Sequence, residues 1–293
     1  MLLSTQTSRL SRRFGDEKAI EIIHNSGFDA FDYTFTDRGE NDPVLKDGFR
    51  DYFKNLREFA DKTGIVCNQA HARFPVAVYG KEEWNRHQYS AVLRDIEAAS
   101  VLGAKIIVVH PIHCGYPFEG MYERNIDFYG GLIEYCDKFG IKIALENMWR
   151  NDPKRGFIIA DACSGAENFA ALLDGLGNSC FTACLDLGHC GLVGEEAQDA
   201  IRTLGGRIGA LHVHDNDYLH DSHTLPYMGK MEWDNILSAL AEVGYSGDFT
   251  YEADSFLDGF PDDLLPEASK FMEIVGRKMI SDIKNYANKG GNK

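Results

Sequence analysis

The feature that most constrains the fold is an eightfold alternation of short apolar segments with longer amphipathic ones. The apolar segments are rich in β-branched and aromatic residues and predict strands at 1–6, 28–35, 65–71, 105–111, 141–147, 181–187, 208–214 and 248–254. The amphipathic segments predict helices at 16–26, 46–63, 84–103, 122–139, 166–175, 195–205, 233–243 and 264–287. Strict alternation favours parallel strands, and eight units favour ring closure, so we predict an α/β fold, a single (β/α)8 TIM barrel.

Glycines punctuate this pattern where a helix gives way to the next strand and a left-handed turn is expected. They are Gly27, Gly64, Gly103, Gly140, Gly244 and Gly247. No GxGxxG or GxxxxGK[ST] loop follows the early strands, which weighs against an open nucleotide-binding sheet. No linker interrupts the alternation, so we predict one domain over residues 1–293, with a frayed tail at 286–293.

Charge, cysteine content and the lack of long apolar segments indicate which binding partners and which cellular compartment to expect. The net charge of −15 repels nucleic acid and anionic membranes at long range. The chain has no signal-peptide core and no apolar run of membrane-spanning length, and its seven cysteines include no CxxC pair. We therefore expect a cytoplasmic protein with reduced thiols, a small-molecule substrate, no nucleic-acid or membrane partner, and a homo-oligomer on the general frequency of symmetric assemblies.

Six metal-capable side chains stand at the C-terminal ends of predicted strands, which is the face where barrels of this kind carry their active sites. They are His71, His110, Glu146, Asp186, His212 and Glu252. The residues two positions before the last four are small (Ala144, Cys184, Ala210 and Thr250), and the residues one position before are large. Because strand side chains alternate between faces, the last four side chains are expected to point together into the barrel.

Three buried carboxylates beside an imidazole require a compensating charge. One or more divalent cations would supply it, and the mixed ligands suit Mn²⁺, Zn²⁺, Co²⁺ or Fe²⁺ better than Ca²⁺. The run DLGH brings His189 over the same mouth, and the segment after strand seven supplies His214, Asp215, Asp221 and His223. The Asp221-x-His223 spacing suits a chelate, so these two residues are candidates for contact with a metal or a substrate.

Four segments carry a resemblance to a known family: LENMW, DLGH, HVHDND followed by HTLPYMG, and TYEAD. In them the chain resembles the xylose isomerase-like barrel superfamily, which includes sugar-phosphate isomerases and epimerases, ketose 3-epimerases, inosose dehydratase and endonuclease IV. The resemblance implies a metal held by Glu146, Asp186, His212 and Glu252. It also implies further substrate or metal contacts, as in endonuclease IV, at His71, His110, His189, Asp221 and His223.

The resemblance implies a divalent-metal-dependent isomerase or epimerase of a sugar, sugar phosphate or polyol, acting by proton transfer through a metal-bound enediolate. Glu146 and Glu252 would be the catalytic acid and base. Aromatic residues near the strand ends are expected to wall the substrate: Phe35, Phe74, Trp149 and Trp233. Ketose 3-epimerases carry an arginine six residues after the seventh-strand histidine, where this chain has Tyr218, so the substrate stays open.

Three alternatives remain at this point. A lyase, either a dehydratase of a keto-inositol or a glycoside-cleaving enzyme, would use the same metal and base. An endonuclease IV-like phosphodiesterase would use the same ligands, but the acidic charge opposes duplex binding. A non-catalytic sugar-binding barrel would carry so many ionisable groups at a cost in stability and without a role for them.

Overall fold

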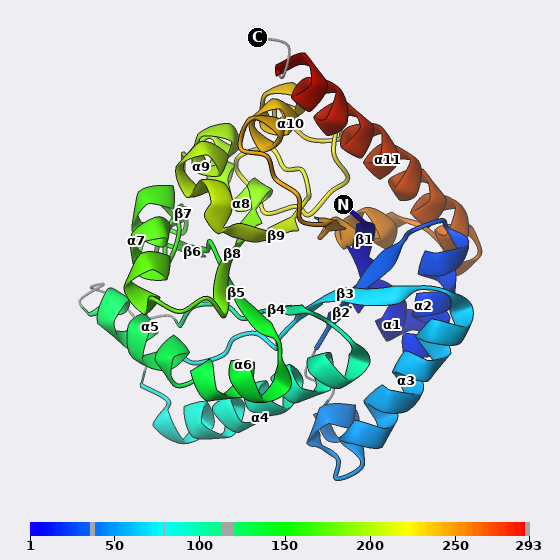
Figure 1. The fold of residues 1–293 in the computed structure, drawn as a ribbon, viewed down its shortest axis with the longest axis vertical. Helices are drawn as coiled ribbons and strands as arrows, with labels where there is room; N and C mark the ends of the chain where they lie inside the picture. Colours follow the sequence, from blue (N-terminus) through cyan, green and yellow to red (C-terminus); the bar gives the residue numbers. More distant parts are fainter. Residues whose placement is uncertain (36–38, 79, 113–119, 291–293) are drawn as a thin grey trace.

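The computed structural model of the chain describes residues 1–35, 39–78, 80–112 and 120–290. A ring of parallel strands forms its centre, and helices surround the ring (Figure 1). The barrel strands are β1 (Leu3–Gln6), β2 (Ala30–Thr34), β3 (Val66–His71), β4 (Ile106–Val108), β5 (Lys142–Glu146), β8 (Phe181–Asp186), β9 (Ile208–His212) and β10 (Phe249–Tyr251). They neighbour one another in chain order, as the alternation of segments predicts.

The ring closes between its last strand and its first, and between β9 and β10. Strand β10 pairs with β1 in parallel register. Val213, the residue after β9, completes the ring: its backbone N donates to Thr250 O at 2.9 Å, and its carbonyl O accepts from Glu252 N at 3.1 Å. The predicted single (β/α)8 TIM barrel is therefore confirmed.

The helices that surround the barrel match the predicted ones with a few differences. They are α1 (Ser8–Phe14), α2 (Asp16–Asn25), α3 (Phe49–Thr63), α4 (Glu82–Leu102), α5 (Met121–Gly130), α6 (Ile133–Phe139), α7 (Ala166–Leu176), α8 (Leu187–Leu192), α9 (Ala197–Leu204), α10 (Trp233–Glu242) and α11 (Leu265–Gly290). The single helix predicted over 122–139 is two helices, because Gly130 and Gly131 have low helix propensity. Helices α1 and α8 were not predicted, since each is too short to show an apolar stripe.

Shorter elements complete the chain. An antiparallel hairpin of β6 (Trp149–Asn151) and β7 (Ile158–Ala160) follows β5, and the sequence did not predict it. The 3₁₀ turns are η1 (Gly39–Asn41), η2 (Pro43–Leu45), η3 (Gly205–Arg207), η4 (Asp254–Gly259) and η5 (Asp262–Leu264). Helix α11 continues through Gly290, so the described part of the segment expected to fray is helical.

Two separate apolar clusters confirm the predicted side-chain parity. Val108, Ala144, Cys184 and Ala210 form a small cluster of their own inside the barrel. The large neighbours Leu145, Leu185, Leu211 and Tyr251 belong to the main core, which lies between the strands and the helices. Small residues inside the barrel leave room above them for the polar groups at the strand ends.

Most of the predicted glycine turns are also found. Gly27, Gly64, Gly103, Gly140 and Gly244 have φ between 62° and 106°. Gly247 does not adopt a left-handed conformation. A Cβ atom there would lie 2.4 Å from the Tyr245 hydroxyl, so the lack of space for a side chain is the reason for a glycine at this position. Within the described ranges no helix combines the length and apolar character needed to cross a bilayer.

Candidate metal centre

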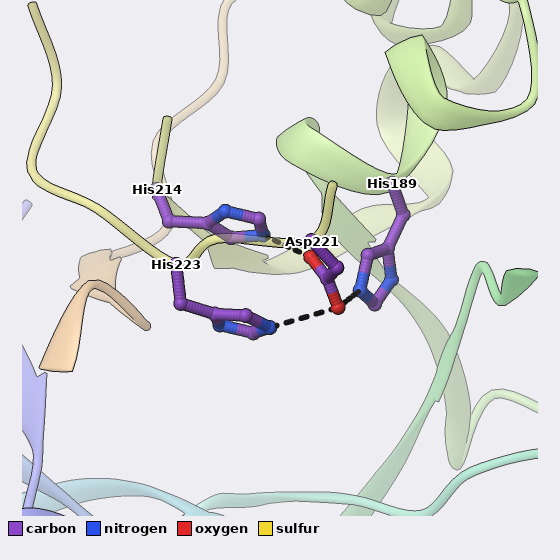
Figure 2. Close-up of side chains that lie close together, drawn as sticks. All are labelled: His189, His214, Asp221 and His223. Carbon is purple, nitrogen blue, oxygen red and sulfur yellow. Dashed lines mark hydrogen bonds and ion pairs between the residues drawn. The ribbon is translucent and has the colours of Figure 1, made fainter. Parts of the chain in front are cut away.

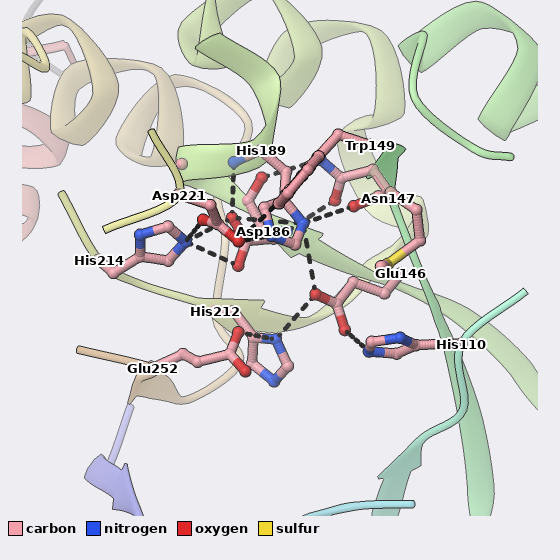
Figure 3. Close-up of polar contacts among 12 residues, drawn as sticks. His110, Glu146, Asn147, Trp149, Asp186, His189, His212, His214, Asp221 and Glu252 are labelled. Carbon is pink, nitrogen blue, oxygen red and sulfur yellow. Dashed lines mark hydrogen bonds and ion pairs between the residues drawn. The ribbon is translucent and has the colours of Figure 1, made fainter. Parts of the chain in front are cut away.

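The four residues predicted to converge do so at the C-terminal mouth of the barrel. Glu146, Asp186 and His212 are the last residues of β5, β8 and β9, and Glu252 directly follows β10. One side-chain oxygen or nitrogen of each lies within 4.8 Å of the others. His212 lies between the two glutamates, with Nδ1 2.8 Å from Glu252 Oε2 and 3.3 Å from Glu146 Oε1 (Figure 3).

A second group adjoins the first and shares Glu146 with it. His110 Nε2 lies 2.9 Å from Glu146 Oε2 and 2.9 Å from Nε2 of His71. These three residues also place ligand atoms within 4.8 Å of one another. The strand ends of β3, β4 and β5 therefore meet as the sequence predicts.

A third group lies on the other side of Asp186 and consists of His189, His214, Asp221 and His223 (Figure 2). Asp221 Oδ2 is 3.0 Å from His223 Nε2 and 3.4 Å from His189 Nε2. His214 Nε2 contacts both oxygens of Asp186, at 3.0 and 3.1 Å, and its ring stacks on His223 with centroids 4.2 Å apart. The loop after β9 thus returns across the mouth and reaches the site.

Backbone carbonyls orient three of these imidazoles. Nδ1 of His71 lies 2.7 Å from Ala72 O, Nδ1 of His189 lies 2.8 Å from Asn147 O, and Nδ1 of His223 lies 2.8 Å from Glu252 O. A carbonyl only accepts hydrogen bonds, so Nδ1 carries the proton in each ring. The lone pair of the neutral ring then resides on Nε2, which is the arrangement that prepares a histidine to bind a metal.

The charges of the site stabilise one another. Burial opposes ionisation of Glu146, but His212 and His110 hold its pKa well below the usual range. Burial also opposes ionisation of Glu252, and His212 lowers the pKa of that carboxyl. The pKa of His212 is raised well above its ordinary value, because Cys184, Glu252 and Glu146 outweigh the effect of burial.

His189 and Asp221 form a further charged pair. Burial lowers the pKa of His189, but Asp186 and Asp221 raise it to about 10. Burial raises the pKa of Asp221, but His189 and His223 shift it below its ordinary range.

Several buried atoms of the site make no hydrogen bond of good geometry within the described part of the chain. Glu146 Oε2, Glu252 Oε2, Asp221 Oδ1 and both ring nitrogens of His212 make ion-pair contacts only, and Nδ1 of His110 and of His214 have no hydrogen-bond partner among the described residues. Unbonded buried polar atoms are rare in proteins and call for a partner. The donor set of carboxylate oxygens and imidazole nitrogens fits Mn²⁺, Fe²⁺, Co²⁺ or Zn²⁺.

Other residues hold the ligands in place, and the sequence analysis did not identify them. Asn147 accepts from Asp186 N at 2.7 Å and donates to Asp186 O at 2.9 Å. Gln6 donates to Glu252 Oε1 at 2.8 Å. Asp186 is the N-cap residue of helix α8 and accepts from His189 N at 2.7 Å, which explains why the DLGH segment folds back over the mouth. Only their positions in the sequence could have indicated these two roles, since Asn147 directly follows the predicted ligand Glu146 and Gln6 is the last residue of a predicted strand.

The four aromatic residues predicted to wall a substrate divide into two pairs. Phe74 is half exposed, with its ring 4.6 Å from that of His110, and Trp149 lies beside His189 and donates its indole N–H to Asp221 Oδ2 at 3.0 Å. Phe35 and Trp233 are instead buried in the core and present no surface to a substrate. Phe35 packs on Phe53 of α3, and the Trp233 indole donates to Asp215 Oδ2.

A (β/α)8 barrel with carboxylate and imidazole groups gathered at its strand ends defines the class of protein. The sequence profile of the xylose isomerase-like TIM barrel family matches residues 20–274, and the chain belongs to that family.

Individual relatives are more distant. An uncharacterized protein of Sinorhizobium fredii is 25% identical over 177 residues, 58% of this chain and 54% of that protein. A D-psicose 3-epimerase of Agrobacterium fabrum is 24% identical over 204 residues, 66% of this chain and 65% of that enzyme. The chain thus spans between about half and two thirds of the length of such curated relatives.

Solved structures share the fold over nearly the whole chain. A D-tagatose 3-epimerase-like protein has a TM-score of 0.73 and 19% identity, with 99% of each chain covered. A D-psicose 3-epimerase from Clostridium cellulolyticum, determined with D-tagatose, has a TM-score of 0.72 and 16% identity, with 95% and 99% covered.

Proposed function

We propose that the protein is a divalent-metal-dependent isomerase or epimerase of a sugar, sugar phosphate or polyol that acts by proton transfer. The observation that carries the proposal is the convergence of Glu146 and Glu252, which come from opposite parts of the barrel, on the same imidazole. The similarity to named sugar 3-epimerases supports the substrate class. Glu146, Asp186, His212 and Glu252 would hold the metal.

When bound, a divalent ion would polarise the substrate carbonyl and stabilise the negative charge that develops on its oxygens. Glu146 and Glu252 would act on the two sides of one carbon atom, one removing a proton and the other returning it. Both must be ionised to serve as base or ligand, and the depressed pKa of each carboxyl supplies that state at neutral pH. The two glutamates have different neighbours: the imidazole of His110 contacts Glu146, and the neutral amide of Gln6 donates to Glu252.

The flanking groups extend this proposal to further ions or to substrate contacts. His71 and His110, with Glu146, form one candidate second site, and His189, Asp221 and His223 form another. In His71, His189 and His223 the bonded Nδ1 directs Nε2 toward the site, which supports a ligand role. Metal analysis of the purified protein, by mass spectrometry with an inductively coupled plasma, distinguishes one ion per chain from two or three.

A lyase is the second candidate, and His189 is the observation that favours it. With its pKa raised to about 10, this imidazole is protonated at neutral pH and faces the mouth, where it could protonate a leaving group. An endonuclease IV-like phosphodiesterase uses a similar set of metal ligands, but the net charge of −15 opposes binding to a duplex.

Turnover in D₂O tests the proposal. A panel of ketoses and polyols is incubated with the metal-loaded protein, and products are followed by NMR. We expect deuterium on the carbon beside the carbonyl, because a carboxyl group that has taken the substrate proton exchanges it with solvent. Loss of water or of a leaving group would instead show a lyase, and full retention of the substrate hydrogen would contradict proton transfer through exchangeable carboxyl groups.

Two variants locate the reaction. Glu252→Gln should abolish deuterium incorporation. Glu97→Gln, which alters a surface glutamate of α4 paired with Arg50, should leave it unchanged.

A further inference from the structure

A buried carboxylate that the proposed reaction does not use lies inside the barrel, beneath the candidate metal centre. Asp32 is the middle residue of β2 and is fully buried. Its neighbours Phe31 and Tyr33 belong to the main core outside the barrel, so alternation directs Asp32 inward. A buried carboxylate is costly unless a charge or several donors stabilise it, which raises the question of its partner.

One partner of Asp32 is neutral and the other is a ligand of the proposed metal. Gln69 of β3 donates from Nε2 to Asp32 Oδ2 at 2.9 Å, while Oδ1 makes no hydrogen bond within the described residues. His212 Nε2 lies 3.7 Å from the same Oδ2 atom. Gln69 thus holds the carboxylate in place, and the imidazole of His212 is the cationic or donor group beside it.

His212 turns a different ring nitrogen toward the carboxylates than the other imidazoles of the mouth do. Its Nδ1 points to Glu146 and Glu252, and Nε2 lies on the other edge of the ring (Figure 3). His71, His189 and His223 have the reverse arrangement, with Nδ1 against a backbone carbonyl. For His212 to offer a lone pair at Nδ1, its proton must reside on Nε2, and that proton needs an acceptor.

We infer that Asp32 is the positioning residue that keeps the proton of His212 on Nε2 and so directs the Nδ1 lone pair to the metal. This inference rests on the metal site of the proposed function. At 3.7 Å the two atoms are within ion-pair distance and beyond the length of a direct hydrogen bond. The Cys184 thiol also contacts His212, but sulfur is a weaker acceptor than a carboxylate.

Substitution by asparagine weakens the effect that Asp32 has on the ring. In Asp32→Asn the amide oxygen would take the place of Oδ2, where it accepts from Gln69 and faces His212 Nε2 without a negative charge. A neutral acceptor holds the proton on Nε2 less firmly, so the tautomer with the proton on Nδ1, which has no lone pair there for a metal, becomes more populated. Partners of metal-bound histidines typically contribute 10- to 100-fold in metal affinity, so we expect the Kd for Zn²⁺ to rise by roughly that factor.

The control is Asp16, a second buried carboxylate, which belongs to helix α2 and lies on the outer side of strand β2. Asp16 accepts from the hydroxyl of Tyr33, the residue next to Asp32, at 2.8 Å, and it lies outside the barrel. Asp16→Asn therefore neutralises a buried carboxylate near β2 without touching the site. Titration of each metal-free protein with Zn²⁺ against a competing chelator gives the affinities, and thermal unfolding with circular dichroism checks that each variant folds.

Long-range ¹H–¹⁵N spectra of the histidine rings supply a readout that a merely structural role would not change. In the zinc-loaded wild type we expect His212 to carry its proton on Nε2 and the metal on Nδ1, and in Asp32→Asn a share of the His212 rings should carry the proton on Nδ1 instead. Folded Asp32→Asn that binds Zn²⁺ as tightly as the wild type, or the proton on Nδ1 in the wild type, would overturn the inference. Tight zinc binding without any turnover of sugars would overturn the proposed function and leave the role of Asp32 intact.

Discussion

Replacing Gly188 by alanine should destabilise the protein, although the usual rule for helices predicts the opposite. Gly188 is the second residue of α8 and adopts no left-handed conformation. In such a position alanine normally stabilises a helix by up to about 1 kcal/mol. Here a Cβ atom would lie 2.1 Å from Cε1 and 2.6 Å from Nε2 of His214, which is far inside the ordinary contact distance.

The size of the effect follows from what holds His214. Its ring is fully buried, bonded through Nε2 to both oxygens of Asp186, and stacked on His223, so it cannot move without breaking these contacts. Overpacking costs about 1–3 kcal/mol, and a lost hydrogen bond to a charged group about 1.5–3 kcal/mol. After the gain in helix propensity, we expect a net loss of about 1.5–6 kcal/mol. With an unfolding entropy of about 2.1 cal/mol/K per residue, this lowers Tm by roughly 2–10 °C in a protein of 293 residues.

Gly130 offers a matched control. It ends helix α5, and a Cβ atom there would meet nothing within 4 Å. Calorimetry of the metal-free proteins should show a clear drop in Tm for Gly188→Ala and little change for Gly130→Ala. An unchanged or raised Tm for Gly188→Ala would refute the steric reasoning and the tight packing of His214 on which it depends.

Three further predictions address the carboxylates and imidazoles of the mouth. Glu252→Gln should lower kcat by about 10²- to 10⁴-fold with the fold retained, as measured by steady-state assays on a substrate found in the panel and by circular dichroism. Burial lowers the pKa of His189, but Asp186 and Asp221 raise it to about 10, above its unfolded value of 6.5. In the metal-free protein, the stability that the protonated His189 contributes should therefore be complete below about pH 6.5 and be lost as the pH rises toward 10. Urea unfolding at several pH values in the presence of a chelator would measure this loss. Trp149→Phe keeps an aromatic ring but removes the donor to Asp221, so unfolding should cost about 1–3 kcal/mol less and the metal content should fall if Asp221 is a ligand.

The barrel and the main ligands could be predicted because both depend on local periodicity. The small residues Ala144, Cys184 and Ala210 alternate with large ones, and this pattern alone places Glu146, Asp186 and His212 on the inner face. Strands of a barrel end at one rim, so residues distant in sequence were expected to meet there. The bounds of the strands differ from the predicted ones by only a few residues for the same reason.

The supporting residues could not be predicted, since they depend on contacts between segments distant in the chain. Trp233 was expected at the mouth as one of the aromatic residues near the strand ends, but its indole instead donates to Asp215. Asp215 also accepts from the backbone of Tyr227 and Met231, so it organises that loop and does not face a substrate. The sequence contains no periodic signal that separates Asp215 from Asp221, although only the second reaches the site.

The three groups at the mouth form one unit because they share carboxylates. Glu146 contacts His212 on one side and His110 on the other, and Asp186 lies between the central group and His214. A substitution at either carboxylate therefore perturbs two groups at once, and its effect on activity cannot be assigned to one ion or one proton. A substitution at His71 has the same drawback, because His71 lies 3.5 Å from Glu146 Oε2 and its ring stacks on His212. His223 contacts Asp221 and His214 through its ring, so a substitution there changes the flanking group of His189, His214 and Asp221. This variant is therefore the one that can separate the number of bound ions from the chemistry.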